Sequence, residues 1–437
     1  MPTARMLESA RRLRASRVGR PVRRRPGGCE MSLVGTVAAS VSLALTGPAL
    51  MIGGNFPGYG TLRGDDPPDQ VTAAVLRADP APETGGHVSF NDPTGDHDQQ
   101  FALVDRIDRA IASSSRDATI RLAAYSFAMP STSEALVRAH ARGVNVRVVV
   151  DDHSAHWGSV RRLEKALGTD TSAQSFVKVC KLSCRGGRGN QHAKFVTISD
   201  GTWGRKGNLH DNLVLVGSLN LTNFSSQRQW NDLYMASDRE AHDQLADVFR
   251  GLVNDTPQPR MRLGETGTGF ATDVAPYRVS SRADDPIESR LARVRCQGAS
   301  LVSGDHGRTV IRISMHAWNG DRGIVLARQV ARLHRRGCDV KVLYGVGMGR
   351  VVANTLRDAG VPIRDSKGAD GRRVHHKVMV LSGVLGRQTD ANYVWTGSHN
   401  WSDRSLRNDE IMFRISGRAL VQAYLANFRT IWKVAKP

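Results

Sequence analysis

The sequence predicts a mixed α/β fold made of two tandem, homologous lobes, with one site at their interface. Two observations support this prediction. A strand–helix–strand pattern occurs at residues 118–151 and again at residues 309–344. Each pattern is followed by a His-x-Lys sequence, an apolar strand and a Gly-Ser-x-Asn sequence. Because one ordered set of features occurs in both halves, we infer a duplicated unit rather than two unrelated domains.

The chain begins with a basic segment followed by an apolar one. Nine arginines lie within residues 1–30, and residues 31–54 carry no charge. Because this is the order of a secretory signal, we predict that residues 1–54 are a signal peptide with a basic leader and that the protein is secreted. The alternative is an extracytoplasmic protein held by a membrane anchor, since about 20 apolar residues can span a bilayer. Residues 55–87, rich in Pro, Gly and Asp, are predicted to be a linker.

Each strand–helix–strand pattern has a clear helix end. The first helix is expected to stop at Gly143 and the second at Gly337, because glycine favours a C-terminal cap. The strand–helix–strand order implies parallel strands covered by helices. We therefore predict an N-terminal lobe at residues 88–255 and a C-terminal lobe at residues 290–437. The turn-rich residues 256–289 are predicted to link them.

The repeated polar residues can perform phosphodiester chemistry. One neutral imidazole can attack phosphorus and form a covalent intermediate, and a protonated one can supply a proton to the leaving oxygen. Lysine, serine and asparagine can donate to the phosphate oxygens. Each lobe would supply half of such a site. The candidates are His192, Lys194, Ser218 and Asn220 in the first copy, and His375, Lys377, Ser398 and Asn400 in the second.

These motifs resemble the HxKxxxxD and GSxN motifs of the phospholipase D superfamily, from about residue 88 to the end of the chain. Phe90-Asn91-Asp92-Pro93 is also similar to bacterial secreted members. The resemblance implies two lobes that share an active site, and a metal-independent mechanism through a phosphohistidine. It implies His192 as the nucleophile and His375 as the acid. We expect no metal and no cofactor, because neither the cysteines nor the acidic residues cluster at ligand spacing around the histidines.

The sequence departs from the family pattern at three places. Ser199 and Ser382 stand where the motif has Asp. That Asp usually has a supporting role, so we expect activity to survive. Family members also carry a downstream acid that orients a His. Glu410 fits this place in the second copy, and Asp232 is the expected substitute in the first.

Four cysteines remain once Cys29 is assigned to the leader. Cys180 and Cys184 are close enough to close a small loop, which leaves Cys296 with Cys338. Export would favour these two disulfides. A four-cysteine metal site and free buried thiols are the alternatives.

The net charge of +20 predicts attraction to an anionic partner. The leading hypothesis is a monomeric, secreted phosphodiesterase that cleaves phospholipid head groups at a membrane surface and can transfer the phosphatidyl group to an alcohol. An endonuclease of the same superfamily is the first alternative, because basic charge favours nucleic acid. A catalytically impaired protein that binds an anionic ligand is the second alternative, which Ser199 and Ser382 leave open.

Other histidines and aromatic residues are weaker candidates for the site. His316 is expected to pack in the core, His376 to point away from the site and His399 to face it. His153 follows a strand end where ligands often bind, but a ligand role is not the favoured interpretation. The tryptophans are expected to pack in the core: Trp157, Trp230, Trp318 and Trp401.

Overall fold

The computed structural model describes residues 86–185, 188–203, 208–255, 262–265, 271–276 and 285–437. The described residues all belong to one compact unit. The predicted signal or anchor at residues 1–54, and the linker at residues 55–87 except for its last two residues, lie outside the described residues. In the ranges that are described, no helix has the length and apolar character needed to cross a membrane.

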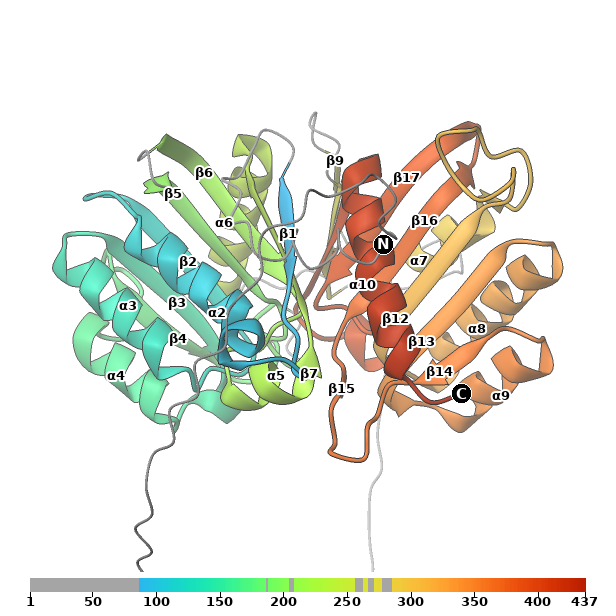
Figure 1. Cartoon of the computed structure of the whole chain (residues 1–437). Coiled ribbons are helices and arrows are strands. Elements are labelled where there is room, and N and C mark those ends of the chain that lie inside the picture. The colour runs from blue at the N-terminus through green and yellow to red at the C-terminus, as the bar shows by residue number, and fades with distance from the viewer. Residues whose placement is uncertain (1–85, 186–187, 204–207, 256–261, 266–270, 277–284) are drawn as a thin grey trace, which may run out of the picture. The chain divides into compact units, whose positions relative to one another are not determined.

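The first lobe contains a seven-stranded sheet with helices on its faces (Figure 1). The strand order is β1-β8-β6-β5-β2-β3-β4. The elements are β1 (His87–Phe90), α2 (His97–Ala112), β2 (Thr119–Ala124), α3 (Pro130–Ala141), β3 (Asn145–Asp151), the 3-10 helix η1 (Asp152–Ser154), α4 (Gly158–Leu167), β4 (Phe176–Cys180), β5 (Phe195–Trp203), β6 (Asn208–Gly217), α5 (Asn223–Arg228), β7 (Gln229–Trp230), β8 (Asp232–Ser237) and α6 (Arg239–Val253).

The second lobe repeats this plan in a nine-stranded sheet. The strand order is β14-β13-β12-β16-β17-β18-β10-β9, and β11 pairs with β16. The elements are β9 (Arg262–Glu265), β10 (Ala271–Ala275), α7 (Pro286–Ala292), β11 (Val294–Arg295), β12 (Val310–Trp318), α8 (Gly320–Arg335), β13 (Asp339–Met348), α9 (Arg350–Asp358), β14 (Ile363–Asp365), β15 (Arg373–Val374), β16 (Lys377–Leu385), β17 (Gln388–Gly397), the 3-10 helix η3 (Arg404–Leu406), β18 (Glu410–Ser416) and α10 (Arg418–Val434).

The predicted strand–helix–strand units form as expected. β2 pairs in parallel with β3, and β12 pairs in parallel with β13. Gly143 and Gly337 follow α3 and α8 with a φ of 92° each, a left-handed conformation that glycine adopts without steric penalty. The segment 256–289, expected to be a linker, also contributes β9 and β10 to the second sheet, where β10 pairs with β18.

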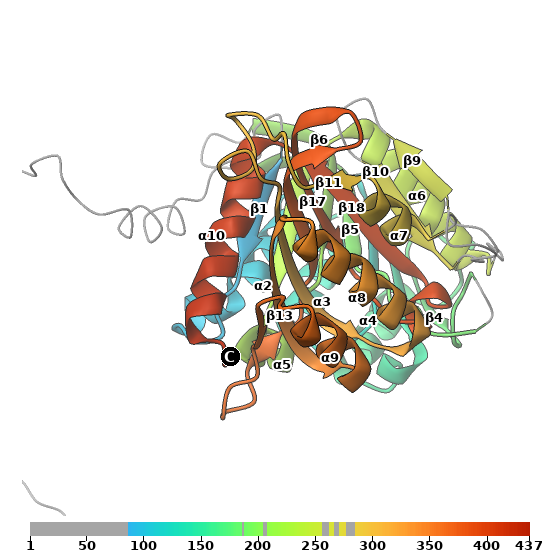
Figure 2. The same ribbon diagram turned by 90° about the vertical axis from the view of Figure 1, so that its right-hand side faces the viewer.

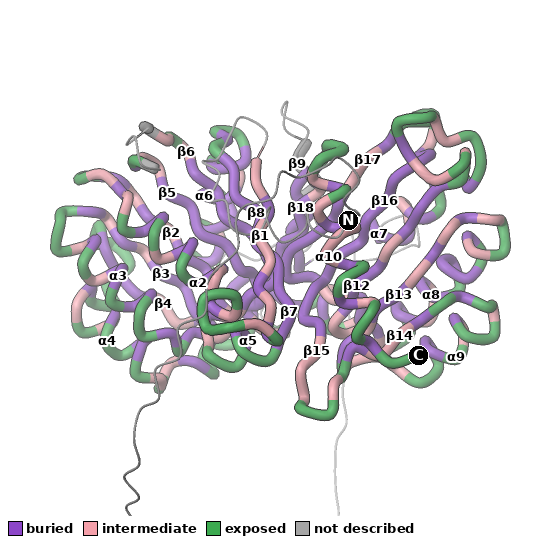
Figure 3. Tube along the Cα trace, in the orientation of Figure 1, coloured by how far each residue is buried: buried purple, intermediate pink, exposed green. Residues whose placement is uncertain are grey.

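The two lobes share a core as well as having their own. Strand residues are mostly buried, and exposed residues gather on the outer helices and loops (Figure 3). One apolar cluster joins Val214 and Tyr234 of the first lobe to Val394, Phe413 and Tyr424 of the second. Removal of this apolar surface from water favours a closed interface between the lobes. Figures 1 and 2 show part of this interface, where α10 of the second lobe runs beside β1 of the first.

Both predicted disulfides are present. Cys180 is bonded to Cys184, and Cys296 to Cys338. The first bond joins the end of β4 to the loop that follows it, and the second joins the residue after β11 to the residue before β13.

We expect the longer disulfide loop to contribute more to stability. It spans 42 residues, against 4 for the shorter one. Because loop closure restricts the unfolded chain, replacement of Cys296 and Cys338 by Ala should lower the free energy of unfolding by about 4 kcal/mol, and replacement of Cys180 and Cys184 by about 2 kcal/mol. Urea unfolding of the two double variants measures both values. An equal loss from the two would contradict this account.

Candidate active site

A cavity of about 680 Å³ receives residues from both lobes. The residues that line it are Tyr125, Ser126, Ala128, Trp157, His192, Asn220, Thr222, Asn223, Phe224 and Gln229 from the first lobe, and His316, Ala317, His375 and Asn400 from the second. Both histidines of the His-x-Lys sequences are therefore present in one cavity, although they are far apart in the chain.

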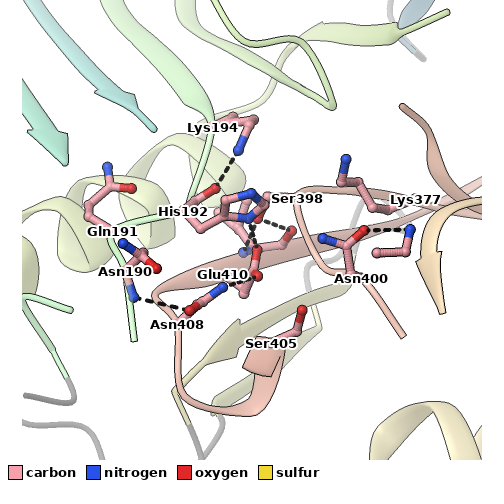
Figure 4. A network of polar contacts seen from close by, with 12 residues as sticks. Asn190, Gln191, His192, Lys194, Lys377, Ser398, Asn400, Ser405, Asn408 and Glu410 are labelled. Carbon is pink, nitrogen blue, oxygen red and sulfur yellow. Dashed lines mark hydrogen bonds and ion pairs between the residues drawn. The ribbon is translucent and has the colours of Figure 1, made fainter. Parts of the chain in front are cut away.

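His192 is oriented by a carboxylate of the other lobe. It lies just before β5, and its Nδ1 is 2.8 Å from Glu410 Oε2 at the start of β18 (Figure 4). Burial lowers the pKa of His192 to about 4, although Glu410 opposes the shift. Burial alone would raise the pKa of Glu410, but the charge and hydrogen bond of His192 outweigh it and lower that pKa to about 2. At neutral pH the Nδ1–H therefore donates to an ionised carboxylate, which leaves the Nε2 lone pair of His192 for chemistry.

His375 is oriented in the same way, but by a neutral side chain. Its Nδ1 lies 2.9 Å from Asn231 Oδ1 of the first lobe. Its backbone N–H donates to Trp230 O at 2.9 Å, where β15 pairs with β7. Burial, followed by the charge of Lys377, lowers the pKa of His375 well below its usual value.

Asn231, and not Asp232, is the counterpart of Glu410. Gly217 pairs with Leu233, and Gly397 pairs with Met412, so the two copies align with Asn231 at the position of Glu410. The expectation that Asp232 orients a histidine is wrong. Its carboxylate instead accepts hydrogen bonds from Ser218, Thr396 and Tyr424, which ties the two lobes together.

The two lysines lie buried beside the histidines, but neither is among the residues that line the cavity. Lys194 Nζ donates to His192 O at 2.8 Å, and Lys377 Nζ donates to His375 O at 2.5 Å. Burial lowers the pKa of Lys194 to about 7. Burial and the charge of Lys194 lower the pKa of Lys377 well below its usual value. A bound anion would compensate both effects, because it would stabilise the two ammonium groups together.

The serine and the asparagine of each Gly-Ser-x-Asn segment have different roles. Asn220 and Asn400 line the cavity, and Asn400 Oδ1 accepts the backbone N–H of Ala317 at 3.2 Å. Ser218 and Ser398 were expected to bind phosphate, but neither is among the cavity-lining residues. Ser218 Oγ donates to Asp232, and Ser398 Oγ accepts the backbone N–H of Ile411. Both hydroxyls thus bridge neighbouring strands.

A family model described as cardiolipin synthase, PLD-like domain, matches residues 107–253 and 306–432. These two segments cover more than half of the chain and include both His-x-Lys and both Gly-Ser-x-Asn sequences. The chain belongs to the phospholipase D superfamily.

The chain is also similar to individual proteins. The mitochondrial cardiolipin hydrolase of Xenopus tropicalis is 32% identical over 117 residues, which cover 26% of this chain and 50% of that protein. The chain thus spans about half the length of this relative. The structure of a phosphatidylserine synthase from Haemophilus influenzae has a TM-score of 0.52 at 11% identity, covering 79% of this chain and 86% of that one. A polyphosphate kinase from Porphyromonas gingivalis has a TM-score of 0.50 at 14% identity, covering 80% and 50%. These two likenesses show the fold.

The motif-Asp positions of the superfamily carry serines with structural roles here. Ser199 Oγ accepts the backbone N–H of Thr119 at 2.9 Å. Ser382 Oγ accepts the backbone N–H of Gly304 and donates to Asn392 Oδ1. Neither serine lines the cavity, whereas His192 and His375 both do. The chain therefore keeps the two histidines of the superfamily site although it has Ser in place of each motif Asp.

The sequence did not predict two residues that stand beside the histidines of this phospholipase D-like site. The ring of Tyr125 lies 4.7 Å from that of His192, and the ring of His316 lies 4.7 Å from that of His375. The prediction that His316 packs in the core is wrong. When the two strand sequences are aligned on their Ile-Arg pairs, Tyr125 and His316 occupy equivalent positions. This equivalence is the sequence signal that could have identified both residues.

The remaining aromatic and histidine predictions have mixed outcomes. Trp157 lines the cavity, contrary to expectation, whereas the other three tryptophans are buried as expected. His376 contacts Ser314 outside the cavity, as expected. His399 does not line the cavity; it is buried and interacts electrostatically with Glu410. Within the described ranges, no group of three or more His, Cys, Asp or Glu side chains could hold a metal ion.

Proposed function

We propose that the protein is a phosphodiester hydrolase of phospholipase D type that acts on phospholipid head groups through a phosphohistidine at His192. One observation carries the proposal: His192, paired with the Glu410 carboxylate, and His375, paired with the Asn231 amide, line the same cavity. A nucleophile and a proton donor are the two groups that such a displacement needs.

The residues divide the reaction into two steps. His192 Nε2 attacks phosphorus, the bond from phosphorus to the head-group oxygen breaks, and His375 gives its proton to that oxygen. His375 then takes a proton from water, whose oxygen attacks phosphorus and releases His192. An alcohol in place of water gives transphosphatidylation. Lys194 and Lys377 stabilise the negative charge of the phosphoryl oxygens, and the substrate anion in turn favours the protonated form of His375.

The walls of the cavity favour an amphiphilic substrate. Tyr125, Trp157 and Phe224 line it, and Phe224 is 48% exposed. The Arg373 guanidinium lies over the Phe224 ring, 4.7 Å from its centroid. Apolar rings next to cations suit a phospholipid, which joins an anionic phosphodiester to acyl chains. The name of the Xenopus relative, a cardiolipin hydrolase, also supports a lipid substrate.

We also propose that the protein works outside the cytoplasm. The basic segment followed by an apolar one at residues 1–54 supports export. The two disulfides also support it, since such bonds persist in oxidising compartments. A monomer remains our expectation.

The test is a direct comparison of substrates. The purified chain, in excess EDTA, is given phosphatidylcholine vesicles or DNA. We expect release of choline and formation of phosphatidic acid, and formation of phosphatidylethanol when ethanol is added. The His192→Asn variant, prepared in parallel, controls for contaminating enzymes.

Three results would count against this function. Cleavage of DNA alone would establish the nuclease alternative, in which the cavity rings would stack bases. Loss of all activity in EDTA would reject the metal-independent mechanism. Binding of anionic vesicles without cleavage of either substrate would indicate an impaired enzyme that only binds its ligand.

A further inference from the structure

A second reactive arrangement lies beside the two histidines of the phosphodiester site. Asp151 ends β3, His153 follows in η1, and Ser126 follows β2. Asp151 Oδ1 lies 2.6 Å from His153 Nδ1, and His153 Nε2 lies 2.9 Å from Ser126 Oγ. A hydroxyl next to an imidazole that a carboxylate orients is the arrangement that activates a serine nucleophile. We propose that Ser126, His153 and Asp151 form a separate site that cleaves carboxylic esters.

The charges suit this role. The Asp151 side chain is fully buried, and that of His153 is 32% exposed. Burial opposes ionisation of Asp151, but hydrogen bonds from His153 and Asn190 hold the pKa of Asp151 below its usual value. An ionised Asp151 fixes the proton of His153 on Nδ1, which leaves Nε2 to accept from Ser126. Ser154 Oγ lies farther from this nitrogen, at 3.4 Å, and donates to Tyr125 O at 2.9 Å.

The serine is accessible, and a donor for the ester oxygen lies next to it. Ser126 lines the cavity together with Asn220 and Thr222. The backbone N–H of Leu221 donates to Ser126 O at 3.0 Å, so Asn220 adjoins the serine. In the other lobe the equivalent Asn400 uses its oxygen on the backbone N–H of Ala317. Asn220 occupies the equivalent place, and its amide N–H groups would donate to a developing oxyanion.

The duplicated lobe lacks this arrangement. The strand registers pair Ala124 with Val150 and Met315 with Tyr344. Two residues beyond Ala124 is Ser126, and two beyond Met315 is Ala317. The residue after Val150 is Asp151, and the residue after Tyr344 is a glycine. Since the second lobe folds the same strands without a Ser, a His or an Asp at these places, the fold itself does not require them.

The reaction balances with water as the only co-reactant. Ser126 Oγ bonds to the ester carbonyl carbon, and its proton passes to His153 Nε2. The bond from that carbon to the alcohol oxygen breaks, and the alcohol takes the proton from His153. Water then gives a proton to His153 and its oxygen attacks the acyl carbon. The bond from that carbon to Ser126 Oγ breaks, His153 returns the proton to Ser126, and the acid is released. The acyl esters of a glycerophospholipid would be the natural substrates, and this choice of substrate rests on the proposed function.

The two centres are neighbours with separate reacting groups. The Tyr125 ring lies 4.2 Å from the His153 ring and 4.7 Å from the His192 ring. The reacting groups differ, so a substitution in one centre removes no reacting group of the other.

A fluorophosphonate probe tests the proposal on the full chain. We expect one covalent adduct, and peptide mass spectrometry should place it on Ser126. Hydrolysis of p-nitrophenyl butyrate should fall at least about 100-fold in Ser126→Ala and in His153→Gln. The matched control is Ser172→Ala, which removes an exposed hydroxyl from the turn at Asp170. It should react with the probe like the parent.

The His192→Asn variant separates the two activities. It should still be labelled at Ser126 and still hydrolyse the butyrate ester. If the parent is labelled at Ser126 but does not cleave phospholipid, the proposed phosphodiesterase function is rejected and the esterase proposal stands. The absence of an adduct on Ser126, or ester hydrolysis that Ser126→Ala does not change, would overturn the esterase and reduce the arrangement to a structural role.

Discussion

The His192→Asn variant should lose phosphodiester cleavage by about 10⁴-fold or more, because asparagine cannot form the covalent bond to phosphorus. The variant should stay folded, since Asn can still donate toward Glu410. The measurement is the initial rate of choline release from phosphatidylcholine vesicles. His156→Asn is the matched control: His156 is exposed and does not line the cavity, so its rate should equal that of the parent.

The companion variant His375→Asn identifies the nucleophile. With a p-nitrophenyl phosphodiester the leaving group needs no proton, so the first step should proceed and the second should stall. A phosphohistidine should accumulate at His192 and survive an alkaline quench for peptide mapping. A phosphoryl group found on His375 in the parent chain would reverse the assignment of the two roles.

The Glu410→Gln variant should lower kcat by about 10²–10⁴-fold. Glutamine preserves the size of the side chain but removes the charge that stabilises a positive, phosphorylated imidazole at His192. Glu288→Gln is the matched control, because Glu288 is also buried but bonds Gln329 outside the cavity. An unchanged kcat in Glu410→Gln would show that Glu410 only orients the His192 ring and that its charge does not contribute to catalysis.

The same variant should move the acidic limb of the pH profile. His192 must be neutral to attack, so kcat/KM in the parent should rise with pH around the His192 pKa of about 4. Glu410 favours the charged imidazole and thus raises this pKa. Its removal should shift the rising limb to lower pH. A shift to higher pH would contradict the electrostatic role of Glu410.

The unequal partners of the two histidines give a physical reason for unequal roles. His192 faces a carboxylate and His375 faces an amide. The charge on His192 persists through the covalent intermediate, so it gains most from Glu410. His375 needs its proton only while the substrate anion is bound. Its low pKa then makes it a strong acid toward the leaving oxygen. Both arguments agree with the nucleophile that the motif resemblance implied.

The sequence by itself determined the duplicated α/β plan and four of the polar residues that line the cavity, namely His192, Asn220, His375 and Asn400. Both results depend on local patterns. The alternation in residues 118–151 and 309–344 predicts strand, helix and strand from neighbours in the chain. His192 and His375 are recognisable because each has its Lys two residues later. The disulfides were also within reach, since the spacing of Cys180 and Cys184 limits the pairings.

The tertiary structure alone decided which partner each histidine has. Asn231 and Glu410 each cross to the opposite lobe, and no local pattern carries that information. Sequence reasoning therefore placed Asp232 in the role of Asn231. The hydroxyls of Ser218 and Ser398 form hydrogen bonds with neighbouring strands and do not line the cavity. These contacts depend on the register of the strands. Ser126, His153 and Asp151 come together only because parallel strands end at one edge of a sheet, so packing and not spacing creates that site.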